Sequence, residues 1–167
     1  GLSGSVSLPE IGMAVSAAWD TGADAGQLVV ILATVFVATG MFFKVAAFPF
    51  HFWAPDVYQG APTPVTTFLA VSSKAAGFAV LVRFVHGVYL GEALNPEWIE
   101  RLGWMVAVLA AITMTYGNIT AVLQRNVKRL LAYSSIAHAG YLLMGVAVMT
   151  SGAADDAVTE GMDALPF

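Results

Sequence analysis

Two lysines stand in apolar stretches where a charged side chain is costly. Lys44 lies between Phe43 and Val45, and Lys74 lies ten residues past Pro64 in a second apolar stretch. A lysine at the centre of a membrane-spanning helix costs at least about 2.5–3.5 kcal/mol, so such residues usually face the bundle interior or a hydrated cavity. An amine held between desolvation and a neighbouring charge can gain and lose a proton near neutral pH. The two lysines therefore predict a proton relay inside a membrane.

The alternative is that each lysine extends its aliphatic stem to the membrane surface. For Lys74 the reach is long, because the residue lies about 15 Å of helix rise from Pro64. Lys44 stands nearer the end of its stretch, but Pro49 and the aromatic residues after it indicate a helix that breaks and continues. Helices broken at mid-membrane leave free backbone groups where transporters bind ions, so we expect Lys44 beside such a break.

Two histidines are secondary candidates for proton transfer. His138 lies in the last apolar stretch with Ser134 and Ser135 one turn earlier, and a hydrogen bond between helices explains it equally well. His51 follows Pro49 and could either admit protons or cap the broken helix.

Other site classes find no support in the sequence. Tyr116 and Asn118 are expected to pack and to form hydrogen bonds between helices. The three histidines lack metal-ligand spacing, and no nucleotide-binding loop or flavin motif is present, so no metal or cofactor site is predicted.

The composition places these residues in a membrane protein. Of 167 residues, 58% are hydrophobic and 11% are charged, against about a quarter charged in soluble domains, and the mean hydropathy is +0.76. The net charge of −4 and the lack of a basic block give no reason to expect nucleic acid as a partner, and the absence of cysteine excludes disulfides. The sequence does not begin with Met and shows no signal peptide, so we interpret it as an internal piece of a longer polypeptide.

Four apolar stretches are long enough to cross a bilayer as helices. They cover residues 28–48, 65–85, 103–123 and 130–149, and none alternates as a β-strand would. A straight helix over 28–58 would be about 46 Å long, which exceeds one span. We therefore expect an all-α, polytopic transmembrane helical bundle with about four spanning helices, the first one broken near Pro49.

The connecting segments predict the orientation. Residues 124–129 hold Arg125, Lys128 and Arg129, which the positive-inside rule places in the cytoplasm. The predicted order is an external loop 1–27 with a short interfacial helix, a broken helix 28–58, a cytoplasmic turn 59–64, a helix 65–85, an external loop 86–102, a helix 103–123, the basic cytoplasmic loop 124–129, a helix 130–149 and an acidic external loop 150–167.

Three runs of sequence resemble one family of membrane proteins. Residues 43–65, 72–78 and 125–141 are similar, in order and spacing, to the regions around the seventh, eighth and tenth helices of subunit N. Subunit N is an antiporter-like membrane subunit of proton-pumping NADH:quinone oxidoreductase, respiratory complex I. The Pro-Phe-His-x-Trp core at 49–53 also resembles the sister subunits L and M, whereas residues 55–64 have the N-type form.

The resemblance implies redox-driven proton translocation by a subunit without redox chemistry of its own. NADH, flavin, iron–sulfur clusters and quinone would belong to other subunits. The partners would be other membrane subunits, antiporter-like neighbours among them, and the lipid of a bacterial-type inner membrane. By position, Lys44 matches the proton-translocating lysine of the family's broken helix, and Lys74 matches the connecting lysine on the next helix.

The resemblance is incomplete at two points. The family pairs its first lysine with a glutamate on an earlier helix and places a third lysine on a later broken helix, and neither has a counterpart in these 167 residues. An Mrp-type cation/proton antiporter subunit and a non-transporting membrane scaffold therefore stay open as alternatives.

Overall fold

The computed structural model describes residues 3–20, 24–90 and 96–163, and helices are the only regular secondary structure in these ranges. The elements are α1 (Leu8–Asp20), α2 (Asp24–Val45), α3 (Trp53–Gly60), α4 (Thr63–Phe68), the π-helical turn η1 (Leu69–Ser73), α5 (Lys74–Val85), the π-helical turn η2 (His86–Leu90), α6 (Pro96–Val122) and α7 (Val127–Asp163). The segment from α4 to η2 is one continuous helical stretch with two π-turns in it.

Four helical stretches of the described chain are long and apolar enough to cross a membrane. They are Ala25–Val45, Thr63–Tyr89, Trp98–Val122 and Val127–Gly152. The structure therefore confirms the expected all-α bundle of about four spanning helices. The chain belongs to a multi-pass membrane protein.

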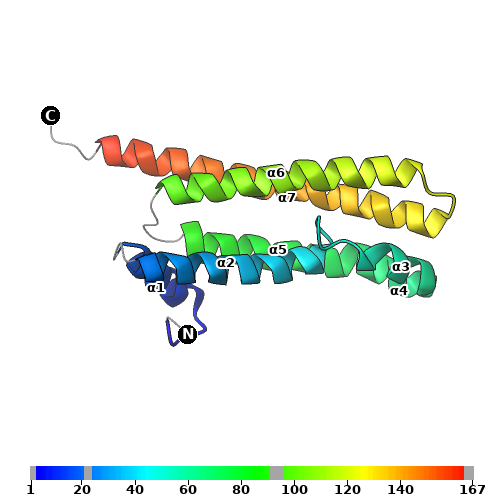
Figure 1. Ribbon diagram of the computed structural model, residues 1–167, viewed down its shortest axis with the longest axis horizontal. Helices are drawn as coiled ribbons and strands as arrows, with labels where there is room; N and C mark the ends of the chain where they lie inside the picture. The colour runs from blue at the N-terminus through cyan, green and yellow to red at the C-terminus, as the bar shows by residue number, and fades with distance from the viewer. Residues whose placement is uncertain (1–2, 21–23, 91–95, 164–167) are drawn as a thin grey trace.

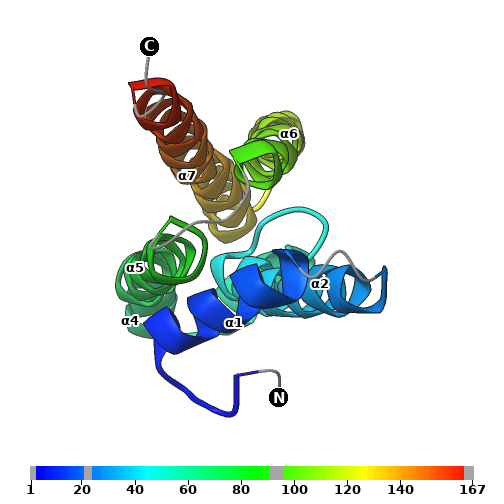
Figure 2. The ribbon, with the colours of Figure 1, turned by 90° about the vertical axis from the view of Figure 1, so that its left-hand side faces the viewer.

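The helices form two layers, with α2 and α5 in one and the antiparallel pair α6 and α7 in the other (Figures 1 and 2). One end of the bundle carries α3, the start of α4 and the connection between α6 and α7, and we call it the basic end. The opposite end carries α1, which lies across α2 and η2 (Figure 2), and we call it the α1 end. Buried apolar residues between the layers form the main core, with Phe42, Val45, Phe78, Leu81, Ala110, Leu143 and Val146 among them.

Small residues let α6 and α7 approach closely. A Cβ placed on Gly117 would lie 2.7 Å from the backbone nitrogen of Ala137, and one placed on Gly140 would lie 2.6 Å from that of Met114. Close backbone approach of this kind is how helices associate in membranes, where burial of apolar surface from water contributes little. The packing of this pair therefore depends on the lack of side chains at these two glycines.

The first spanning helix ends at Val45, and the chain resumes helical structure only at Trp53. Ala47 N–H donates to the Phe42 carbonyl over 2.9 Å, and Ala46 N–H donates to the Phe43 carbonyl over 3.2 Å. This pair of bonds is a Schellman motif, and Ala46 has the positive φ of 60° that the motif requires. A helix C-terminus is thus built one residue after Lys44, slightly earlier than Pro49 suggests.

Several helices extend further than the hydropathy of the sequence predicts. The expected loop 150–167 is helical as far as Asp163, and the expected loop 86–102 contains η2 and the first turns of α6. Hydropathy marks where apolar sequence ends, whereas a helix ends only where its backbone bonding is broken. The stretch after Thr150 is rich in alanine and contains no proline before Pro166, so nothing local stops α7 at the end of its apolar part.

Helix α1 occupies the position that the sequence predicts for a short helix, and it packs on protein. Its apolar residues Leu8, Ile11, Val15 and Trp19 contact a cluster built on Val88, Tyr89 and Ile99. The indole rings of Trp19 and Trp98 lie 4.5 Å apart. The α1 end of the bundle is therefore covered by a layer of apolar side chains.

Candidate functional site

Lys74 is a buried amine that joins two helices. Only 8% of the residue is exposed, and its Nζ donates to both the carbonyl oxygen and the hydroxyl of Ser135, over 2.5 and 2.7 Å. The residue begins α5 directly after η1, and π-turns inside longer helices are frequent at functional sites. The expectation that Lys74 faces the bundle interior agrees with this geometry, whereas η1 and the bond to Ser135 were not predicted.

A groove with several polar side chains in a mostly apolar lining connects Lys74 with the basic end of the bundle. It is an open pocket of about 530 Å³ between the α3–α5 segment and α7. Its polar lining consists of Tyr58, Thr63, Thr66, Thr67, Lys74, Lys128, Ser134, Ser135 and His138. Most of the surface that these side chains expose to the groove is apolar, and the side-chain hydroxyl that accepts from Lys74 is that of Ser135.

Ser135 links the lysine to the broken helix. The Tyr58 side chain of α3 lies near the Ser135 hydroxyl, and Tyr58 is 3% exposed. One serine on α7 therefore bonds Lys74 of α5 and lies close to Tyr58 of α3. The paired serines at 134 and 135 in an apolar span were the available sequence signal, but the sequence does not show which of them meets the lysine.

Lys44 lies beside the break as expected, in the last turn of α2, but it is exposed in this chain. Its stem runs along α5 at Gly77, where an added Cβ would lie 3.5 Å from Lys44 Cγ and 3.0 Å from Val45 Cγ1. The expected burial of Lys44 is therefore not found among the described residues. The physical reason is that α2 packs against the rest of this chain through one face. Val45 lies on that face and belongs to the core, whereas Lys44 lies at its edge and is exposed.

His51 is buried within an aromatic cluster at the break. Its ring lies 5.5 Å from that of Phe48 and 4.5 Å from that of Tyr116, and 7% of the residue is exposed. Within the described part of the chain, its Nδ1 atom has no hydrogen-bond partner. His51 does not line the groove that contains Lys74. Tyr116 packs against the aromatic rings at the break, and packing is what the sequence predicts for it.

His138 lines the groove and is exposed. Its Nδ1 lies 2.8 Å from the Ser134 carbonyl on its own helix, so this nitrogen does not form the interhelical bond that was the alternative explanation. The bond between α6 and α7 comes instead from Asn118, whose Nδ2 donates to the Tyr141 hydroxyl over 2.9 Å. His138 is thereby left with its other ring nitrogen available at the wall of the groove.

The basic residues at the start of α7 hold α3 in place. Lys128 Nζ donates to the Ala61 carbonyl at the end of α3 over 2.9 Å, as cations at helix C-termini commonly do. Arg129 Nη1 lies 2.6 Å from Asp56 Oδ1 and 3.1 Å from Gln59 Oε1. These residues were expected mainly to set the orientation, with lipid headgroups or a neighbouring subunit as secondary contacts, and their contacts to α3 were missed because they join positions about 70 residues apart in sequence.

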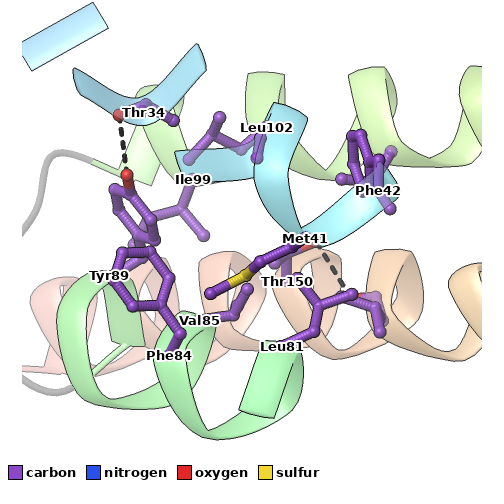
Figure 3. Close-up of a pocket in the computed structure, with 13 residues that line it drawn as sticks. Thr34, Met41, Phe42, Leu81, Phe84, Val85, Tyr89, Ile99, Leu102 and Thr150 are labelled. Carbon is purple, nitrogen blue, oxygen red and sulfur yellow. Dashed lines mark hydrogen bonds between the residues drawn. The ribbon is translucent and has the colours of Figure 1, made fainter. Parts of the chain in front are cut away.

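On the α1 side of Lys74, the space between the helices is apolar. Figure 3 shows a cavity of about 70 Å³ between α2, α5, α6 and α7, with Met41, Phe42 and Leu81 at its edge. The Thr34 and Tyr89 hydroxyls are 2.6 Å apart and hydrogen-bonded to each other, and Thr150 donates to the Ala147 carbonyl. Because these hydroxyls already have hydrogen-bond partners, the cavity has few free polar groups that could bind a water molecule. Lys74 thus lies between an open groove that contains some polar groups and a cavity that is almost entirely apolar.

Among the described residues, no group of three or more His, Cys, Asp or Glu side chains could hold a metal ion. The site consists of one buried amine, the serine that binds it, and the open groove that leads to the basic end.

The family model described as NADH:quinone oxidoreductase/Mrp antiporter, TM, matches residues 1–162. NADH-quinone oxidoreductase subunit N of Anaeromyxobacter sp. (strain Fw109-5) is 48% identical over 160 residues, which is 90% of this chain and 31% of that protein. Subunit N of Chlorobium chlorochromatii (strain CaD3) is 55% identical over 132 residues, 77% of this chain and 25% of the relative.

A third relative, subunit N 1 of Sorangium cellulosum (strain So ce56), is 50% identical over 159 residues, which is 94% of this chain and 30% of the relative. The chain thus spans between a quarter and a third of the length of these relatives. The match over nearly the whole sequence and the high identities establish that the chain belongs to the NADH:quinone oxidoreductase/Mrp antiporter transmembrane family.

Proposed function

We propose that this chain forms part of the proton path through a membrane subunit of an NADH–quinone oxidoreductase. The observation that carries the proposal is Lys74, a buried amine bonded to Ser135 at the inner end of a groove that leads to the basic end. The names of the relatives support the assignment to this enzyme. The chain performs no redox chemistry itself: NADH, flavin, iron–sulfur clusters and quinone belong to other subunits.

The Lys74–Ser135 pair can pass a proton without moving the backbone. A protonated amine donates to the Ser135 hydroxyl, as it does in the structure. After the amine releases a proton to water in the groove, the freely rotating hydroxyl can donate back to Nζ. Tyr58, near Ser135, can extend this chain of hydrogen bonds towards the basic end, and His138, on the groove wall about one turn further along α7, can extend it in the opposite direction.

Lys44 is the second carrier in this proposal. Its stem meets α5 at Gly77, about one turn after Lys74, whose own amine is bonded to α7. The exposed side of α2 around Lys44 faces other helices of the parent subunit, which supply its acidic partner. A change in charge there alters the proton affinity of Lys44, and a proton then moves between Lys44 and Lys74 through hydrated groups.

The proposed orientation places the basic end in the cytoplasm of a bacterial inner membrane. Arg125, Lys128 and Arg129 lie at this end, and cytoplasmic loops carry an excess of such residues. The groove then opens to the cytoplasm, and the apolar cavity lies towards the outside. Antiporter-like neighbours and lipid contact the exposed apolar faces of α2 and α6, on which Phe36, Trp104 and Ile119 are more than half exposed.

Replacement of Lys44 by Ala in the parent subunit tests the proposal. We expect a loss of at least about tenfold in proton uptake per NADH oxidised by membrane vesicles, because a positioned acid–base group typically contributes 10²–10⁴ to proton transfer. Lys44 is not part of the buried core of this chain, so we expect the complex still to assemble. Normal pumping by an assembled Lys44→Ala complex would reject the proposed role.

Ser135 gives a smaller, local test. Ser135→Ala removes one of the two acceptors of Lys74 Nζ but leaves the carbonyl, so we expect a fall in pumping of about 3- to 10-fold, the equivalent of one hydrogen bond. Ser134→Ala is the matched control, because only the Ser134 carbonyl forms the bond to His138. Equal pumping by the two variants would show that the Ser135 hydroxyl is not used.

An Mrp-type antiporter subunit is the second candidate, because the matching family model covers both kinds of protein. The two differ in what drives transport. Purification of the parent with its partners separates them: flavin and iron–sulfur absorbance in the purified complex supports the respiratory enzyme. Sodium-dependent proton transport without NADH oxidation would support the antiporter.

A further inference from the structure

The interrupted stretch between α2 and α3 leaves backbone groups without helical partners, and two side chains satisfy them. Trp53 Nε1 donates to the Phe43 carbonyl over 2.9 Å. The Phe48 N–H donates to the Thr113 hydroxyl over 3.2 Å. Trp53 belongs to the broken helix itself, whereas Thr113 lies on α6, 65 residues further along the chain. The break is therefore hydrogen-bonded to another helix, α6, through the Thr113 hydroxyl.

The Thr113 side chain is fixed in the orientation that this bond requires. It is fully buried, with 0% exposure, and its hydroxyl donates to the Leu109 carbonyl of its own helix over 2.6 Å. With its single hydrogen committed to Leu109, the oxygen can only accept from Phe48. The Thr113 hydroxyl is thus oriented so that its oxygen accepts the hydrogen bond from the Phe48 N–H.

Helix α6 makes a second contact with the same loop. Tyr116, one turn after Thr113, packs its ring 5.7 Å from that of Phe48 and 4.5 Å from that of His51. The three residues between Lys44 and Phe48 are almost completely buried, with exposures of 0, 2 and 0% for Val45, Ala46 and Ala47. The short, tightly packed path from Lys44 to Phe48 means that an anchor at Phe48 also fixes the end of α2.

We propose that Thr113 is a positioning residue for Lys44, acting through the backbone of the break. This inference rests on the proposed role of Lys44 in proton transfer. Thr113 does not transfer protons itself: it holds the end of α2 so that the Lys44 stem crosses α5 beside Lys74. Loss of its acceptor leaves a partly buried N–H unpaired, and the break then shifts or takes up water.

The test compares Thr113→Val with Thr113→Ser in the assembled complex. Valine keeps the shape of threonine but removes the acceptor, whereas serine keeps the acceptor and removes a methyl group. Proton uptake per NADH oxidised should fall about 3- to 10-fold with valine, as for the loss of one hydrogen bond, and stay within about twofold of the parent with serine. Equal pumping by the valine variant and the parent would overturn the proposal.

A double-mutant cycle separates positioning from a purely structural role. If Thr113 acts through Lys44, Thr113→Val should cause no further loss in a Lys44→Ala background. Independent, multiplying effects would overturn the proposal, as would a lower amount of complex with normal pumping per assembled complex. If valine prevents assembly, Thr113→Ala removes the same hydroxyl with less bulk, and failure of both to assemble shows a role in folding alone.

The cycle also distinguishes this inference from the proposed function. Normal pumping by Lys44→Ala would reject the role of Lys44, and the positioning role would be rejected with it. A loss with Lys44→Ala alone, without a loss on Thr113→Val, would reject only the positioning role.

Discussion

Replacement of Lys74 by methionine is expected to abolish most of the proton pumping of the parent enzyme while leaving the complex assembled. Methionine matches the length of the lysine stem and removes a buried amine whose desolvation is costly, so packing between α5 and α7 should persist. The proton path loses the amine at the inner end of its groove. Proton uptake per NADH oxidised should fall about tenfold or more, measured in membrane vesicles against the quantity of assembled complex.

Lys74→Arg separates a proton carrier from a fixed positive charge. Arginine keeps the charge and can donate to Ser135, but it does not release its proton in proteins. The open groove of about 530 Å³ beside the residue leaves room for the larger head group. If Lys74 carries protons, the arginine variant should pump as poorly as the methionine variant. Near-normal pumping with arginine would show that Lys74 supplies only charge.

The buried position of Lys74 was predictable from sequence because its distance from Pro64 is a property of one helix. Its partner was not, because Ser135 lies 61 residues away and the choice between two adjacent serines depends on how α5 and α7 cross. The π-turn η1 was also not predictable. Residues 69–73 are ordinary for an apolar helix, and a π-turn changes only which face the following residues present.

Lys44 shows a different limit of sequence reasoning. Pro49 indicated a break, and the structure has one between Val45 and Trp53. The exposure of Lys44 depends on what else covers α2, and that information is not local. The same is true of Thr113, which is one of several hydroxyl residues on α6. Only the crossing of α6 over the break identifies it as the acceptor for Phe48.

The largest structural effect is expected at the contact between α6 and α7. Gly140→Ala would place a Cβ 2.6 Å from the Met114 nitrogen and 2.9 Å from the Ala110 carbonyl oxygen. Both neighbours are backbone atoms, so the helices must separate instead of a side chain turning aside. Overpacking a core by one group costs about 1–3 kcal/mol, and Gly140→Leu should cost more. We expect several-fold less assembled complex with alanine and none with leucine.

Gly145 provides the matched control on the same helix, because an added Cβ there meets nothing within 4 Å. Gly145→Ala should leave the amount of assembled complex unchanged, since alanine also favours the helix over glycine. Quantification of the parent subunit in purified complexes measures both variants. The comparison tests helix packing independently of proton transfer, because neither glycine contributes a titratable group. Equal accumulation of Gly140→Ala and Gly145→Ala would contradict the close approach of α6 and α7, and with it the crossing geometry that brings Thr113 to the break and Ser135 to Lys74.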